Sequence, residues 1–293
     1  MSRLPCTLSL VSVLLMVACG SSQDLDEKYS VGWTDTILVA SFNVQNFGTG
    51  KLEDSVVTEI VVAIIRHFDI IALQEIRGPK DHILNAFVRV LNDGHDGPYA
   101  FVSGEPVGSS GHLEQYGFIY DRTRVSWAAG EVETYPLEGF VRPPLLARFT
   151  TFAGFDFVLA TVHIKPDDAR AEIDELVYVM KYGRDRFPSQ EDVIVLGDFN
   201  ADCSYFNEST DTSPARGPDY NWAIGDELDT NVASSECTYD RIIFSHTVTD
   251  EDYTGNHGVF RFDAVLGLDA STTQDVSDHY PVWVEFSTTD DTD

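Results

Sequence analysis

The 293-residue sequence predicts an α+β fold in which β-sheets pack in a two-layer or four-layer sandwich. Many short apolar segments of strand length follow one another, and only a few segments have apolar residues at helical spacing. Neither an internal repeat nor an interdomain linker interrupts residues 36–287. We therefore expect one continuous domain over that range.

The amino-terminal part of this domain predicts a β–α–β unit. Residues 36–47 (TILVASFNVQNF) have the pattern of a buried strand, residues 56–68 carry apolar side chains at helical spacing, and residues 69–77 return to a strand. A mixed helix near 80–92 follows. The next segments have the spacing of hairpins with glycine-containing turns, with strands near 99–103, 116–120, 125–129, 146–152 and 155–162.

The carboxyl-terminal part predicts strands that are separated by longer connections. A helix near 168–182 precedes the strand 193–197, and further strands cover 240–245 and 281–286. Residues 203–236 are rich in Ser, Thr, Asp, Gly and Pro, which predicts a long irregular segment. We expect an acidic loop between the last two strands.

The first residues predict export. Arg3 precedes the apolar stretch 8–18, which is short for a membrane span and typical of a signal-peptide core. Small residues before Cys19 and a Gly/Ser run after it favour a bacterial lipoprotein lipidated at Cys19, and the alternative is an ordinary secretory signal cut nearby. We therefore expect a leader (1–19), a polar tether (20–35), the domain (36–287) and an acidic tail (288–293), in an outer-membrane lipoprotein or a secreted protein.

Export makes the cysteine count informative. Cys6 leaves with the leader and Cys19 is the lipidation site, so Cys203 and Cys237 remain in the mature domain. Two cysteines in an oxidising compartment predict a disulfide, which contributes about 3–4 kcal/mol in the chain-entropy model. The alternative is two unrelated buried thiols.

The charge balance restricts the partners of the protein. Its 48 acidic and 19 basic residues give a formal net charge of −29. Such a surface repels nucleic acid and anionic membranes at long range, although a salty habitat would screen the repulsion. Any role in binding a polyanion therefore requires a local basic patch or bound cations.

A carboxylate, amide or imidazole follows the apolar residues at the end of several predicted strands. Each one alone fits a turn or a helix cap, but convergent strand ends would gather them on one rim. Oxygen ligands suit Mg²⁺, and a histidine paired with a carboxylate suits proton transfer to a phosphate ester. The sequence has no Walker loop, zinc-type cluster or nucleophile elbow. The strand-end residues are Asn43, Glu75, His163, Asp198, Asn200, Asp240, Asp278 and His279.

The segments that carry these residues resemble, in order, motifs of the endonuclease/exonuclease/phosphatase superfamily. The resemblance runs from about residue 37 to 286 through SFNVQNF, IIALQEIR, HLEQYGFIY, VIVLGDFNADCSY, TYDRIIF and SDHYPVWVEF. GDFN and SDHYP mark the superfamily as a whole. GDFNADCSY with a later CTYDRI resembles the secreted deoxyribonuclease I branch, whose main structural disulfide matches Cys203–Cys237.

The resemblance implies a four-layer α/β/β/α sandwich of two mixed sheets with the site at one edge. It implies that Glu114 pairs with His163 and Asp240 with His279, so that one dyad activates water and the other protonates the leaving oxygen. It also implies that Asp198 and Asn200 position the phosphate and the water. The expected ligands of an active-site Mg²⁺ or Mn²⁺ are Asn43, Glu75 and Asp278.

The resemblance further implies contacts with DNA. Arg77 and Arg142 match basic residues that bind the DNA backbone, and Tyr239 lines the same surface. His112 replaces the minor-groove tyrosine of the family, and Ser109 replaces an arginine. We expect duplex DNA as the substrate of a monomer. Structural Ca²⁺ is a further expectation: Asp229 matches a ligand position, but threonines of the family are replaced by Asn231, Ala233 and Ser235.

The expected function is therefore an exported, metal-dependent endonuclease that hydrolyses DNA to 5′-phosphate products. One alternative is a sphingomyelinase-like phosphodiesterase that acts on lipid or small-molecule phosphoesters. The sequence has no aromatic hairpin of the kind that enters a bilayer, which disfavours it. The other alternative is an inactive surface lipoprotein, which the retention of both dyads and the metal ligands disfavours.

Overall fold

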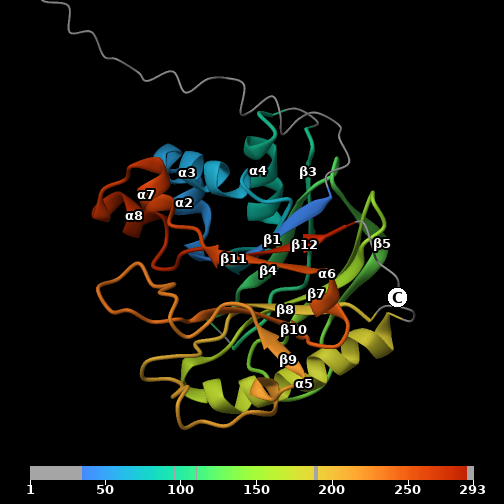
Figure 1. Cartoon of the computed structure of the whole chain (residues 1–293). Coiled ribbons are helices and arrows are strands. Elements are labelled where there is room, and N and C mark those ends of the chain that lie inside the picture. Colours follow the sequence, from blue (N-terminus) through green and yellow to red (C-terminus); the bar gives the residue numbers. More distant parts are fainter. Residues whose placement is uncertain (1–34, 95–96, 110, 188–190, 289–293) are drawn as a thin grey trace, which may run out of the picture. The chain divides into compact units, whose positions relative to one another are not determined.

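Two six-stranded sheets pack face to face in the computed structural model, which describes residues 35–94, 97–109, 111–187 and 191–288 (Figure 1). The first sheet contains, in spatial order, β11 (Tyr253–Val259), β12 (Val282–Ser287), β1 (Thr36–Phe47), β2 (Ile70–Ile76), β4 (Gln115–Asp121) and β3 (Tyr99–Ser103). The second contains β5 (Val125–Thr134), β6 (Leu145–Thr151), β7 (Asp156–His163), β8 (Val193–Asp198), β10 (Asp240–Ser245) and β9 (Tyr220–Trp222). Both sheets are mixed, because β1–β2 and β7–β8 are parallel and their other pairings are antiparallel.

Helices cover the outer face of each sheet, so the predicted α/β/β/α sandwich is confirmed (Figure 1). On the side of the first sheet lie α2 (Thr49–Glu53), α3 (Ser55–Ile65), α4 (His82–Leu91), α7 (Phe262–Leu266) and α8 (Ala270–Val276). The long helix α5 (Ala169–Arg186) lies against the second sheet. The connections add α6 (Thr249–Asp252) and two 3₁₀ turns, Pro166–Asp168 and Pro214–Arg216.

Three clusters of buried apolar side chains separate these layers. The cluster between the sheets includes Phe118 and Phe149, whose rings meet edge to face with centroids 5.5 Å apart. A second cluster joins the first sheet to α3 and α4, and a third joins the second sheet to α5. Strands β2 and β8 are buried on both faces, which explains why their sequences are nearly continuous apolar runs.

The structure differs from the sequence predictions in two connections. The expected acidic loop before the last strand contains α6, β11, α7 and α8, and the expected irregular segment 203–236 contains β9. Residues Thr254–His257 of β11 are exposed and do not alternate between polar and apolar. This edge strand is held by backbone pairing with β12, and backbone pairing leaves no hydrophobic pattern in the sequence.

The expected leader, the lipidation site Cys19 and nearly all of the tether and tail lie outside the described residues. None of the helices in the described part of the chain is both long and apolar enough to cross a membrane.

Candidate active site

The strand order places the polar strand ends on one edge of the sandwich. Parallel strands β7 and β8 both end there, while β10 begins there because it runs antiparallel to β8. The register sets His163 beside Asp198 and Asp198 beside Asp240. Adjacent strands therefore deliver three of the predicted site residues to neighbouring positions.

Hydrogen bonds between the two sheets bring the first sheet to the same edge. Asn43, at the end of the buried part of β1, donates from Nδ2 to Asp198 Oδ2 at 3.0 Å. One layer deeper, Gln74 Nε2 donates to Thr161 Oγ1 at 2.8 Å. These four side chains are all buried, so unpaired amides there would be costly and the bonds fix how the two edges meet.

The end of β8 and the residues after it are shaped by the close approach of β8 to β7. Gly197 lies within β8, and a Cβ there would lie 1.9 Å from Val162 O. Phe199 is fully buried against Trp222, with ring centroids 5.8 Å apart. Asn200 has a φ of 47° and donates from Nδ2 to Ile164 O at 3.0 Å. The chain therefore sends Phe199 inward and keeps the residues on either side of it at the edge.

The first candidate dyad is the pair of His163 and Glu114. His163 Nδ1 lies 2.9 Å from Glu114 Oε1, and the Glu114 carboxylate is buried. The His163 backbone is held on both sides: its N–H donates to Tyr116 Oη at 2.9 Å, and its carbonyl accepts from Arg142 Nε at 2.8 Å. The ring therefore has a fixed position and directs Nε2 toward Asp198, 3.4 Å away.

The second candidate dyad is the pair of His279 and Asp240. His279 Nδ1 lies 2.8 Å from Asp240 Oδ2, and both residues are buried. Thr230 Oγ1 accepts the Asp240 N–H at 3.2 Å, and Ser277 Oγ accepts the His279 N–H at 3.0 Å. His279 Nε2 lies 3.6 Å from Asp198 Oδ2, so the same carboxylate oxygen faces both imidazoles.

Electrostatics couple the two dyads through Asp198. Burial opposes charge on His279, but Asp240 and Asp198 outweigh it and raise the pKa of His279 to about 10. Burial also lowers the pKa of His163, but the carboxylates of Glu114 and Asp198 outweigh it and raise that pKa overall. For Asp198, burial is outweighed by His279 and His163, which hold its pKa below the ordinary value. These interactions favour an ionised Asp198 beside a protonated His279.

Three oxygen-bearing side chains beside the dyads fit a hard divalent cation. Asn43 Nδ2 lies 3.2 Å from Glu75 Oε1, and Glu75 is turned toward it by a left-handed backbone, with φ of 59°. Asp278 Oδ1 is buried without a hydrogen-bond partner among the described residues, which leaves it available to a ligand. Amide and carboxylate oxygens are the donors that Mg²⁺ prefers. Glu75 and Asp278 therefore offer oxygens of the kind the expected ion needs. The Asn43 oxygen accepts the Gln45 N–H at 3.0 Å, so Asn43 would join them only with its amide turned the other way round.

Lys51 links the two chain segments that carry these oxygens. Its ammonium donates to Val44 O at 3.2 Å and to Val276 O at 2.7 Å. Burial lowers the pKa of Lys51, while the nearby Asp278 and Glu75 carboxylates oppose that change. Nothing in the sequence indicated this role, because a lysine in the middle of a short helix such as α2 has the pattern of a solvated surface residue.

The expected DNA contacts lie around the dyads, with one exception. Arg77 Nη2 lies 3.6 Å from Glu114 Oε2, Arg142 Nε lies 3.8 Å from Glu114 Oε1, and the Tyr239 ring lies 6.1 Å from the His279 ring. His112 is exposed in a turn in which its N–H donates to Ser109 O. The structure gives His112 no contact with either dyad among the described residues.

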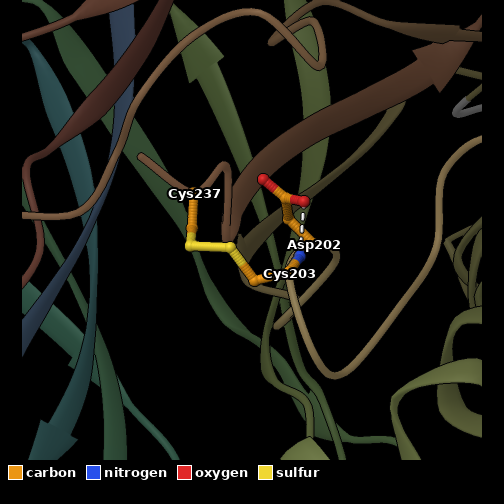
Figure 2. A group of neighbouring side chains, drawn as sticks. All are labelled: Asp202, Cys203 and Cys237. Atoms are coloured by element: carbon orange, nitrogen blue, oxygen red, sulfur yellow. Dashed lines mark hydrogen bonds between the residues drawn. A yellow bond between two sulfur atoms is a disulfide. The ribbon is translucent and has the colours of Figure 1, made fainter. Parts of the chain in front are cut away.

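The predicted disulfide between Cys203 and Cys237 is present and lies just before Asp240 in the chain (Figure 2). Asp202 accepts the Cys203 N–H and, at 2.6 Å, the Thr238 N–H, so it ties together the two segments that the disulfide joins. Asp202 and the two sulfur atoms lie close together, but sulfur in a disulfide is not a thiolate and does not make this group a metal site.

Several residues that shape the site were missed from the sequence. Tyr116, Gln74, Thr161 and Ser277 lie inside or beside strands as buried polar groups, and Arg241 is a fully buried arginine. Glu172 projects from α5 and accepts the Val141 N–H and the Lys165 N–H, both at 3.0 Å. In the sequence, such a residue is visible as a polar residue within an apolar run. The sequence does not show which residue it hydrogen-bonds to.

Solved structures with the same architecture define the class of fold. The chain matches D. rerio TDP2 complexed with single strand DNA product at a TM-score of 0.58 and 18% identity, over 87% of this chain and 100% of that one. It matches an endonuclease/exonuclease/phosphatase family protein from Bacteroides thetaiotaomicron at a TM-score of 0.56 and 17% identity, over 86% of this chain and 94% of that one. These likenesses establish the fold.

Sequence comparison establishes the family. Residues 40–279 match the Endonuclease/Exonuclease/phosphatase family, and the chain belongs to it. The chain is 33% identical to Deoxyribonuclease-1 of Equus caballus and 32% identical to Deoxyribonuclease-1 of Homo sapiens, in each case over 85% of this chain and 92% of the relative. Within the family it is therefore a hydrolase of the deoxyribonuclease-1-like type.

Proposed function

We propose that the protein is an exported endonuclease that hydrolyses DNA phosphodiester bonds to 5′-phosphate products with the help of a divalent metal ion. The observation that carries the proposal is the position of Asp198, whose Oδ2 lies 3.4 Å from His163 Nε2 and 3.6 Å from His279 Nε2. This oxygen marks the point on which both dyads converge. The relatives named Deoxyribonuclease-1 support DNA as the substrate.

Each dyad has the chemistry of a proton-transfer device. A buried carboxylate that accepts from Nδ1 fixes the tautomer of its histidine and stabilises the imidazolium, so that Nε2 exchanges the proton. One imidazole takes a proton from the attacking water and the other gives a proton to the leaving 3′ oxygen. Asp198 lies between them, and Asn200 donates its N–H to Asp198 Oδ1 at 3.0 Å. The two residues would orient the phosphate and the water.

Asn43, Glu75 and Asp278 are the residues that would hold Mg²⁺ or Mn²⁺ in this proposal. When bound, the ion would neutralise charge that develops on the phosphate oxygens. Glu75 is suited to the role because the nearby His163, the Asn46 N–H and the Asn43 amide outweigh its burial and keep its pKa below the ordinary value. Glu75 is therefore an anion over the whole physiological pH range.

Two arginines lie beside the dyads, and each is within 4 Å of the Glu114 carboxylate. Arg142 donates from Nε to the His163 carbonyl at 2.8 Å, so its guanidinium charge lies next to the first dyad, where a backbone phosphate would bind. Arg77 is held over Glu75 and Glu114, and Tyr239 lies next to His279. We propose that these residues bind the backbone of duplex DNA, with His112 at the edge of the binding surface. We also propose that the protein acts as a monomer and is exported through its leader.

A nuclease assay on supercoiled plasmid tests the proposal. We expect nicked and linear products in Mg²⁺, loss of activity in EDTA, and recovery when Mg²⁺ or Mn²⁺ is restored. The same preparation is assayed on single-stranded DNA, RNA and sphingomyelin. Full cleavage in EDTA would exclude the metal-assisted mechanism, and turnover of sphingomyelin without turnover of plasmid would favour the lipid phosphodiesterase.

A further inference from the structure

The loop from Asp229 to Cys237 holds the backbone of the second dyad. Thr230 Oγ1 accepts the Asp240 N–H at 3.2 Å, Asn231 forms a β-bridge with His279, and Val232 N–H donates to Asp278 O at 2.8 Å. Successive residues of one loop therefore contact both partners of the dyad. Anything that fixes this loop also fixes the position of His279 relative to Asp240.

The Asn231 side chain fills the interior of this loop. Its Nδ2 donates to Ser235 O at 2.9 Å and to Ser235 Oγ at 2.8 Å, while its Oδ1 accepts the Ala233 N–H at 3.1 Å. The orientation of the amide is determined, because a carbonyl requires a donor and an N–H requires an acceptor. Asn231 itself is buried, while its partners Ala233 and Ser235 are exposed, so these bonds lie at the boundary between the loop interior and the solvent.

The same loop is where the resemblance places a calcium site, and its groups do not fit one. Calcium takes six to eight oxygen ligands, usually with several carboxylates. Here Asp229 Oδ1 already accepts the Asn231 N–H at 3.0 Å and the Cys237 N–H at 3.1 Å. Ala233 has no side-chain oxygen, and the amide of Asn231 presents hydrogens to Ser235 where a cation would need oxygens. The loop is closed by hydrogen bonds within the protein.

We propose that Asn231 closes the 229–237 loop in place of a cation, so that the placement of the His279–Asp240 dyad does not depend on calcium. Asn231 is thus a positioning residue for that dyad. The catalytic consequence rests on the proposed function, whereas the calcium independence of the loop does not.

The test compares the melting temperature (Tm) of the full chain in CaCl₂ and in EGTA, with Mg²⁺ held constant. The variants are Asn231→Ala and Asn231→Asp, and the matched control is Asn85→Asp, an exposed asparagine on α4. We expect the wild type and the control to have the same Tm in both buffers. Asn231→Ala should melt at a lower temperature that calcium does not restore.

Asn231→Asp provides the sharper readout. A carboxylate at position 231 cannot donate to Ser235 and repels Asp229, so its Tm should fall in EGTA and recover in part when calcium binds the two carboxylates. Calcium sensitivity would then appear in a protein whose wild type lacks it. If Asn231 had only a structural role, Asn231→Asp would have a lower Tm than the wild type, and that Tm would be the same in CaCl₂ and in EGTA.

Two results would overturn the proposal: a calcium-dependent rise in wild-type Tm that Asn231→Ala abolishes, or an unchanged Tm in Asn231→Ala. If Asn231→Ala does not fold, Ser235→Ala is measured in its place, with a smaller loss of Tm and no calcium response expected. Absence of nuclease activity in the wild type would refute the proposed function and leave the Tm comparison decisive for the loop.

Discussion

Ser277 Oγ donates a hydrogen bond to the backbone oxygen of Asn43 at 2.7 Å, across 234 positions of the sequence. The same hydroxyl oxygen accepts the His279 N–H at 3.0 Å. One buried side chain therefore joins a metal-ligand candidate on the first strand to a dyad histidine before the last strand. The edge of the sandwich is held together by polar contacts of this kind, and Lys51 forms a second one beside it.

Ser277→Ala should lower both stability and turnover. The substitution leaves the Asn43 carbonyl and the His279 N–H without a buried partner, which costs about 1–3 kcal/mol for each unsatisfied group. Urea unfolding measures the first effect and plasmid cleavage the second. Ser271→Ala, at an exposed position of α8, is the control and should leave turnover unchanged. An unaltered unfolding free energy in Ser277→Ala would show that the hydroxyl does not link the two segments.

His163→Ala and His279→Ala should each abolish plasmid cleavage to within the sensitivity of the assay. General acid–base groups contribute about 10²–10⁴-fold to rate, and each imidazole is the proton carrier of its own dyad. Because the two act in one reaction, the double variant should lose little more than either single variant. Circular dichroism establishes that each variant is folded. A variant that cleaves at the wild-type rate would remove that histidine from the mechanism.

Glu172→Gln should raise KM for DNA and lower kcat together. The Glu172 carboxylate accepts from N–H groups next to Arg142 and two residues after His163, and glutamine offers an oxygen to only one of them. Its amide NH₂ would face the other N–H and push the two segments apart. Steady-state kinetics on plasmid measure the change, with Glu191→Gln, at an exposed position before β8, as control. A loss of Tm with both kinetic constants unchanged would restrict Glu172 to a structural role.

The sequence predicted most strands, the three longest helices (α3, α4 and α5) and the strand-end residues because each leaves a local signal. Buried strands such as β8 are apolar runs of strand length, and Asp198 or Asn200 after such a run is visible without a partner. The contacts that assemble the edge leave no such signal. Gln74 and Thr161 are 87 positions apart, and only the packing of two sheets makes them partners. Asn231 illustrates the same limit. In the sequence it stands where the family has a threonine beside a calcium ligand, whereas in the structure its side chain closes the 229–237 loop by hydrogen bonds to Ala233 and Ser235.

The ion pair between the buried Arg241 and Asp226 predicts how the stability of the protein depends on pH. Its Nη1 lies 3.0 Å from Asp226 Oδ1, and Arg216 donates to Asp226 Oδ2 at 2.7 Å. Burial raises the pKa of Asp226, but the two guanidinium groups outweigh it and bring that pKa below its ordinary value. A lowered pKa in the folded state means that Asp226 stabilises the protein above the pKa of about 4 that it has when unfolded, and that this stabilisation disappears as pH falls through the folded value.

Asp226→Asn should therefore reduce the free energy of unfolding at pH 7, and the difference from wild type should shrink as the pH is lowered below about 4, where the wild-type carboxylate also becomes neutral. Urea unfolding at a series of pH values measures the difference at each step. Asp185→Asn, which removes the carboxylate of an exposed pair with Lys181, is the control and should show little difference at any pH. A constant difference between Asp226→Asn and wild type down to pH 3 would mean that the carboxylate contributes by its shape and hydrogen bonds and that its charge is not needed to hold Arg241 in the interior.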